Sequence, residues 1–263
     1  MNNAAGNTIE AVYPLSPTQE GMLFHSLMEQ GTGVYVVQVA FTLRGPVNDT
    51  AFDAAWRSLV GRHDVLRTAF VWEKVDFPLQ VVGKEAALVL TNLDWEDADV
   101  AAGSPMESKN IPGYLEWLNE DRARGFAAKV APLMRVTKIR LGPEHFRVVW
   151  TYHHLILDGW SLPLLLKEWV SAYAKPKTAG EEVPSRLNYR DYIAWMQSQD
   201  SETAKSYWER YLTGWKAPTS LGNLRQKVAS ETKSASLSIS LAPSCTQQLK
   251  SVAQRERVTM STL

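Results

Sequence analysis

Two adjacent histidines, His153 and His154, precede Asp158 and Gly159 in the stretch HHLILDG, and these residue types could catalyse acyl transfer. A neutral imidazole accepts a proton or a hydrogen bond near pH 7, because the reference pKa of histidine is about 6.5. Such a group suits the attack of an amine or an alcohol on an acyl group. The ordinary alternative is a pair of strand-end histidines bonded to the backbone, followed by a turn at Asp158 and Gly159.

A strand and a helix must position this corner. Residues 145–152 (HFRVVWTY) are rich in β-branched and aromatic side chains, which predicts a strand that ends at the histidines. Adjacent side chains of a strand point to opposite faces, so only one of the two histidines can face a given cavity. After the corner, Ser161 can cap a helix whose apolar residues recur at helical spacing, and Pro163 is tolerated in its first turn.

The corner resembles the HHxxxDG signature of the condensation domains of nonribosomal peptide synthetases, members of the chloramphenicol acetyltransferase-like superfamily. Further segments resemble other motifs of that family. They are YPLSPTQEGMLFHSL at residues 13–27, RHDVLRTAF at residues 62–70 and YRDYIAW at residues 189–195. Motifs five to seven have no counterpart. The resemblance therefore covers almost the whole chain but about half of a full condensation domain.

The resemblance implies roles for the residues at the corner. His154, the second histidine, is the catalytic candidate, and His153 is expected to support it. An arginine of the RHDVLRTAF segment is expected to pair with Asp158 and to lock the corner. By position, Arg67 is favoured over Arg62 as this partner.

The reaction implied is amide formation between an upstream acyl, aminoacyl or peptidyl donor and a downstream aminoacyl acceptor. Both would be thioesters on the 4'-phosphopantetheine arms of peptidyl carrier proteins, and the arms would meet in a tunnel between two lobes. The chain itself would bind no cofactor directly, and its other partners would be an adjacent adenylation domain and the missing C-terminal lobe. Gly159 would admit a pantetheine arm because it lacks a Cβ, and Trp160 and Ser161 would line the tunnel.

Three other functions stay open. An epimerisation domain shares the HHxxxDG motif and would convert a stereocentre of a carrier-bound residue. A coenzyme A-dependent acyltransferase of the same superfamily is compatible with the HxxxD pattern alone. A non-catalytic lobe that docks carrier proteins is the third, because a tunnel between two lobes needs a second wall. For that reason the chain alone is expected to show little turnover.

Composition narrows the class of protein. The chain has 263 residues, of which 45% are hydrophobic, and this is ample material for a core. Its 28 basic and 28 acidic residues balance, so no overall field favours nucleic acid or a membrane surface. Cys245 is the single cysteine and cannot form an internal disulfide, and no Cys/His motif predicts a metal site. With no signal peptide or membrane-spanning run recognised, we expect a cytoplasmic protein.

The expected fold is an α/β lobe with a mixed, largely antiparallel sheet flanked by helices and with the active corner at the open edge of the sheet. Residues 1–12 are expected to be a flexible segment, residues 13–257 the N-terminal lobe, and residues 258–263 the start of the missing C-terminal lobe. Residues 133–141 and 145–152 should form a hairpin. Residues 98–112 and 174–185 should be loops, residues 188–212 one long helix that packs Tyr192 and Trp195, and residues 235–241 a strand.

Overall fold

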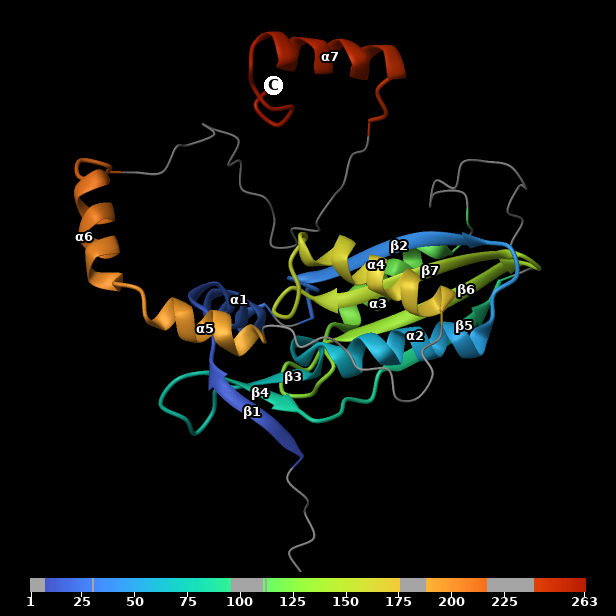
Figure 1. Cartoon of the computed structure of the whole chain (residues 1–263), viewed down its shortest axis with the longest axis horizontal. Helices are drawn as coiled ribbons and strands as arrows, with labels where there is room; N and C mark the ends of the chain where they lie inside the picture. Colours follow the sequence, from blue (N-terminus) through green and yellow to red (C-terminus); the bar gives the residue numbers. More distant parts are fainter. Residues whose placement is uncertain (1–7, 30, 96–110, 112, 176–187, 217–238) are drawn as a thin grey trace, which may run out of the picture. The chain divides into compact units, whose positions relative to one another are not determined.

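The computed structural model describes residues 8–29, 31–95, 111, 113–175, 188–216 and 239–263 (Figure 1). The chain divides into two compact units, residues 1–200 and residues 201–263. The first unit contains all the strands that the structure describes and all the residues of the predicted corner.

Two sheets form the framework of the first unit. The smaller sheet has the order β1-β4-β3, with β1 at Ile9–Pro14, β3 at Thr68–Val71 and β4 at Leu79–Gly83, all antiparallel. The larger sheet has the order β2-β7-β6-β5, with β2 at Val36–Arg44, β5 at Val89–Asp94, β6 at Met134–Gly142 and β7 at His145–His153. Only β5 runs parallel to its neighbour, β6, within the described residues. The mixed, largely antiparallel α/β fold is therefore confirmed.

The strand that carries the histidines lies inside the larger sheet. β7 pairs with β2 on one side and with β6 on the other, and the predicted hairpin between β6 and β7 is present. The expectation that the corner lies at the open edge of the sheet is wrong. The corner instead follows the end of an inner strand, whose backbone is fixed by hydrogen bonds on both sides.

Helices cover both faces of the larger sheet. In the first unit they are α1 (Pro17–Met28), α2 (Asp49–Arg62), the short 3₁₀ helix η1 (Asp64–Arg67), α3 (Tyr114–Arg124), α4 (Ser161–Ala174) and α5 (Tyr189–Gln197). The side chain of Trp150 packs with α2 and α4, whereas its neighbour Val149 packs with Tyr114 of α3. This alternation along β7 follows from the strand period of two and places α3 on the face opposite α2 and α4.

Three tryptophans form the centre of the main core. The ring of Trp56 on α2 lies 5.2 Å from that of Trp150 on β7 and 5.4 Å from that of Trp169 on α4, measured between centroids. All three side chains are buried. Burial of large aromatic side chains contributes strongly to stability, so this cluster fixes the two helices against the strand that carries the histidines.

Some predicted elements differ from the structure. β1 begins at Ile9, so residues 9–12 of the segment expected to be flexible belong to a strand. The expected long helix over residues 188–212 is two helices, α5 and α6 (Ser201–Tyr211). The side chains of Ser198 and Gln199 both donate to the carbonyl of Trp195 and so compete with helix continuation. Residues 239–241 are not a strand, and the rest of that prediction lies outside the described residues, as do most of the two predicted loops.

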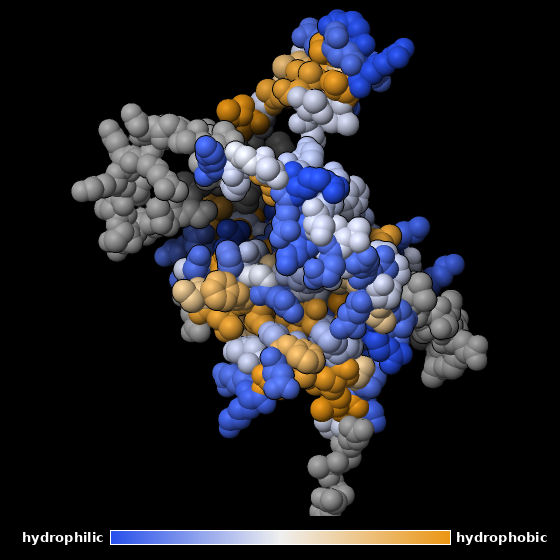
Figure 2. Space-filling model, turned by 90° about the vertical axis from the view of Figure 1, so that its left-hand side faces the viewer, coloured by the Kyte–Doolittle hydropathy of each residue, from blue (hydrophilic) through white to orange (hydrophobic). Residues whose placement is uncertain are grey.

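The second unit contains α6 and α7 (Pro243–Arg255), and the latter confirms the predicted helix at residues 243–257. No residue of α6 is buried. Over the described parts of both units, no helix is long and apolar enough to span a bilayer. Figure 2 shows hydrophobic residues scattered in patches among hydrophilic ones on one face of the molecule, as is normal for a folded protein.

Candidate active site

The backbone at the corner is held from both sides. The N–H of His153 donates to the carbonyl of Leu133 at 2.9 Å, and the N–H of His154 donates to the carbonyl of Tyr35 at 2.8 Å. The two imidazoles, which leave the strand on opposite faces, therefore have different surroundings.

His153 is a buried, neutral histidine. Its Nδ1 accepts the N–H of Leu155 at 3.1 Å, and its Nε2 lies 3.2 Å from the hydroxyl of Ser26, which itself donates to the carbonyl of Met22 at 2.7 Å. The ring must therefore carry its proton on Nε2 and donate it to Ser26. Burial, together with the neighbouring His154, lowers the pKa of His153 to about 4. These contacts give His153 a structural role.

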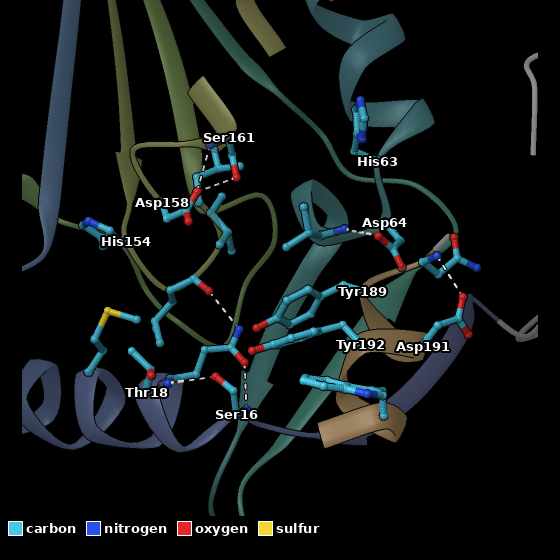
Figure 3. Close-up of a pocket in the computed structure, with 18 residues that line it drawn as sticks. Ser16, Thr18, His63, Asp64, His154, Asp158, Ser161, Tyr189, Asp191 and Tyr192 are labelled. Atoms are coloured by element: carbon cyan, nitrogen blue, oxygen red, sulfur yellow. Dashed lines mark hydrogen bonds between the residues drawn. The ribbon is translucent and has the colours of Figure 1, made fainter. Parts of the chain in front are cut away.

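His154 faces a cavity of about 830 Å³ (Figure 3). Its side chain is partly exposed, and among the described residues the imidazole has no hydrogen-bond partner. Both ring nitrogens are thus available to a molecule in the cavity. An imidazole that faces a cavity and is free to accept a proton is the most reactive group that this site offers.

The ends of several helices meet at this cavity. First-turn residues of α1, η1, α4 and α5 line it, and in Figure 3 they surround the space opposite His154. Each end is closed by a side-chain oxygen, from Ser16, Asp64, Asp158 and Asp191 respectively. The partial positive charge of each helix end is therefore matched by a local acceptor.

Asp158 is a capping residue. One of its carboxylate oxygens, Oδ1, accepts the backbone N–H of Ser161 at 2.8 Å and the hydroxyl of Ser161 at 2.6 Å. The hydrogen bond from that hydroxyl is the main cause of a lowered pKa of Asp158. The capping oxygen at the start of α4 thus comes from Asp158, and the expectation that Ser161 supplies it is wrong because Ser161 is already the first helical residue and donates instead.

Arg67 does not lock the corner through Asp158, so the predicted pair is wrong. Its guanidinium is buried and donates to Glu10 Oε2 at 2.6 Å, to the carbonyl of Val60 at 3.1 Å and to the carbonyl of Gly83. These groups surround Arg67 at the start of β3 and satisfy a buried cation there. Arg67 therefore fastens β1 and β4 to the end of α2.

Arg62 and the residues after Asp158 have different positions. Arg62 pairs with Glu168 at 3.0 Å and so links α2 to α4. Ser161 lines the cavity, whereas Trp160 is not among its lining residues and is 88% exposed. A Cβ added to Gly159 would meet no atom of the protein within 4 Å, so the space next to Gly159 is open.

Gln19 is a functional candidate that sequence reasoning took only for a helix cap. Its side chain is buried, and its Nε2 donates to the carbonyl of Leu155 at 2.9 Å and to Gln80 Oε1 at 3.1 Å. Gln19 therefore ties the corner to α1 and β4. A buried amide cannot be told from an exposed one by residue type, so no signal in the sequence alone identified this link.

The aromatic side chains of α5 form one wall of the cavity. Tyr189, Tyr192 and Trp195 line it, with ring centroids 5.6 Å and 5.8 Å apart in succession. Tyr192 and Trp195 are 47% and 58% exposed, so the expectation that they pack inside the protein is wrong. Ile193 instead anchors the helix, because it is buried with Tyr13 and Val82. In the described ranges no group of three His, Cys, Asp or Glu side chains could hold a metal ion.

Comparisons with known proteins agree on one family. A family model described as "Condensation domain" matches residues 9–263. One protein of the linear gramicidin synthase of Brevibacillus parabrevis is 40% identical over 267 residues, which cover 97% of this chain and 3% of that protein. Bacitracin synthase 3 of Bacillus licheniformis is 34% identical over 257 residues, 97% of this chain and 4% of that protein. The chain thus spans a small part of the curated relatives.

Solved structures with the same fold include the starter condensation domain of rhizomide synthetase RzmA. That structure has a TM-score of 0.63 and 20% sequence identity, over 80% of this chain and 50% of the solved chain. A four-domain nonribosomal peptide synthetase, holo-AB3403, gives a TM-score of 0.59 and 17% identity over 80% of this chain and 15% of that chain. The likeness in fold therefore extends over most of the present chain.

Proposed function

The chain belongs to the condensation-domain family, and from that premise we propose that it forms the amide bond in nonribosomal peptide synthesis. The donor is an acyl, aminoacyl or peptidyl thioester on an upstream carrier protein, and the acceptor is an aminoacyl thioester on a downstream one. Both substrates are carried on 4'-phosphopantetheine arms, and an adenylation domain supplies the activated amino acid. The single observation that carries the proposal is the position of His154, which faces a cavity with an imidazole free of internal hydrogen bonds.

The step balances without any further reactant. The acceptor's amine nitrogen attacks the donor's thioester carbonyl carbon, a C–N bond forms, and the C–S bond breaks to release the donor carrier's thiol. The amine loses one proton and the departing sulfur gains one. An α-amine has a pKa of about 8, so a neutral fraction exists at pH 7. His154 orients this amine and accepts its proton as the C–N bond forms.

The surroundings of His154 support this role. Its backbone is fixed by Tyr35 and its neighbour His153 is neutral, so the ring is held without an adjacent positive charge. The cavity volume of about 830 Å³ is in the range of small-molecule sites. The open space at Gly159 leaves room for a pantetheine arm to approach.

The test is dipeptide formation from two loaded carrier proteins, followed by mass spectrometry. The assay uses the chain alone and the chain joined to the second half of a related condensation domain, because this chain covers 50% of the solved starter domain. We propose that turnover needs both halves. In the joined protein, His154→Ala should lower the rate by about 10² to 10⁴-fold and leave the melting temperature unchanged. The exposed His25→Ala is the matched control.

The same assay separates the rival functions. Native rates from a folded His154→Ala protein would overturn the proposed mechanism. Inversion of a carrier-bound residue without a new bond would indicate an epimerisation domain. Acyl transfer from a free coenzyme A thioester would indicate a coenzyme A-dependent enzyme. Carrier binding without any turnover in the joined protein would leave only a docking lobe.

A further inference from the structure

Tyr35 has an unusual backbone conformation next to the site. Its φ angle is +58°, in the left-handed region that side chains other than glycine seldom adopt. It is the third residue of a turn that closes where the N–H of Val36 donates to the carbonyl of Gly33 at 3.0 Å. A positive φ at this position is what a type II turn requires, and such turns usually place glycine or asparagine there.

The surroundings of the turn hold Tyr35 in this conformation. Gly33 packs so closely on α3 that an added Cβ would lie 2.7 Å from Cγ of Arg122 and 3.0 Å from its carbonyl oxygen. On the other side, the ring of Tyr35 lies between those of His25 and His153, with centroids 6.3 Å from each. A strained residue persists where its neighbours determine its conformation, and such residues gather at functional sites.

The conformation of Tyr35 has one direct consequence for the site. Its carbonyl accepts the N–H of His154 at 2.8 Å, whereas the N–H of His153 is held by Leu133 on β6. We propose that Tyr35 is a positioning residue for His154: its left-handed backbone aims the carbonyl that fixes the His154 backbone, and its ring braces His153. The value of this positioning for turnover rests on the proposed function, but the hydrogen bond itself can be tested without any substrate.

The test compares Tyr35→Val with Tyr35→Asn in the 263-residue chain by amide hydrogen exchange, detected by NMR. Asparagine tolerates a positive φ, whereas β-branched valine does not. The exchange of the His154 amide should be about tenfold faster or more in Tyr35→Val than in Tyr35→Asn. The His153 amide is the internal control, because it donates to Leu133 and should exchange at the same rate in both variants.

Two exchange results would overturn the proposal. One is equal exchange of the His154 amide in the valine and asparagine variants. The other is acceleration of the His153 and His154 amides by the same factor, because that is the sign of general destabilisation. Neither result depends on catalysis, so a failure of the proposed function leaves this test intact.

A kinetic measurement completes the test in the protein that forms dipeptides. Tyr35→Val should lower kcat by about tenfold or more while KM for the acceptor stays within about twofold, and Tyr35→Asn should stay close to native. An unchanged kcat in a Tyr35→Val protein whose His154 amide exchanges faster would also overturn the positioning role.

Discussion

The hydroxyl of Ser26 and Nε2 of His153 lie 3.2 Å apart, and the chain of hydrogen bonds through them is complete only when His153 is neutral. A second ring proton would sit on Nδ1 and face the N–H of Leu155. The site therefore contains two adjacent histidines with separate tasks, one locked by its hydrogen bonds and one open to the cavity.

The first prediction concerns stability at acid pH. The unfolded chain binds a proton at His153 near pH 6.5, but the folded chain does so only near pH 4. Unfolding is therefore favoured as the pH falls through this window, and His153 should remove about 3 kcal/mol from the free energy of unfolding between pH 6.5 and pH 4. Urea unfolding at several pH values checks this. His153→Gln should have a shallower pH dependence than the native chain and than the exposed control His25→Gln; equal slopes would contradict the prediction.

The second prediction concerns the start of α4. Asp158→Ala removes the capping oxygen and should lower the free energy of unfolding by about 1 kcal/mol at pH 7, and Asp158→Asn by less, because an amide oxygen can still accept. Since the pKa of Asp158 is lowered by the Ser161 hydroxyl, this stabilisation is full above the ordinary pKa of about 3.9 and is lost as the pH falls below it.

The matched variant for the cap is Ser161→Ala, which removes the hydroxyl but keeps the backbone N–H that Asp158 accepts. It should raise the pKa of Asp158, as followed by NMR titration of the carboxyl carbon. A titration identical to that of the native chain would show that the hydroxyl is not the main cause of the shift.

The third prediction separates Arg67 from its partner. Arg67→Ala leaves the carbonyls of Val60 and Gly83 without a donor and should cost at least about 2 kcal/mol of unfolding free energy. Glu10→Gln should cost less than about 1 kcal/mol, because the side chain of Glu10 is 44% exposed and water can solvate it. Chemical denaturation measures both. Similar losses in the two variants would mean that the ion pair, and not the carbonyl contacts, stabilises this junction.

The fourth prediction tests the link made by Gln19. Gln19→Leu leaves the carbonyl of Leu155 and Oε1 of Gln80 without their donor, and this should lower the free energy of unfolding by about 1 to 3 kcal/mol. Gln247→Leu, at an exposed position of α7, is the control and should change stability by no more than about 0.5 kcal/mol. An equal effect of the two substitutions would argue against a buried amide that holds the corner.

Local signals were sufficient to predict much of the fold. The β-branched run that ends at His153 predicted β7, and the pattern Ser16-Pro17-Thr18-Gln19 predicted the capping box that the structure contains at the start of α1. These features depend on neighbours within a few residues of each other, so residue type and spacing are enough to predict them.

Contacts between distant segments were harder to predict. The partner of Arg67 lies 57 residues away, in a segment whose polar composition suggested a loose end. Exposure of Tyr192 and Trp195 depends on which face of α5 meets β1, and the buried Ile193 decides it. Side-chain partners and the sense of an amphipathic face are set by tertiary packing, and periodicity along one segment does not reveal them.

The pairing of β2 with β7 also determines when the corner can form. Val36 lies opposite His153, and 127 residues separate Ser26 from His153. Closing so long a loop is entropically costly before its contacts are made, and sheets built from such pairings fold slowly. During synthesis, β2 must wait for β7 to leave the ribosome, so the histidine site is assembled late and is absent from any shorter nascent chain.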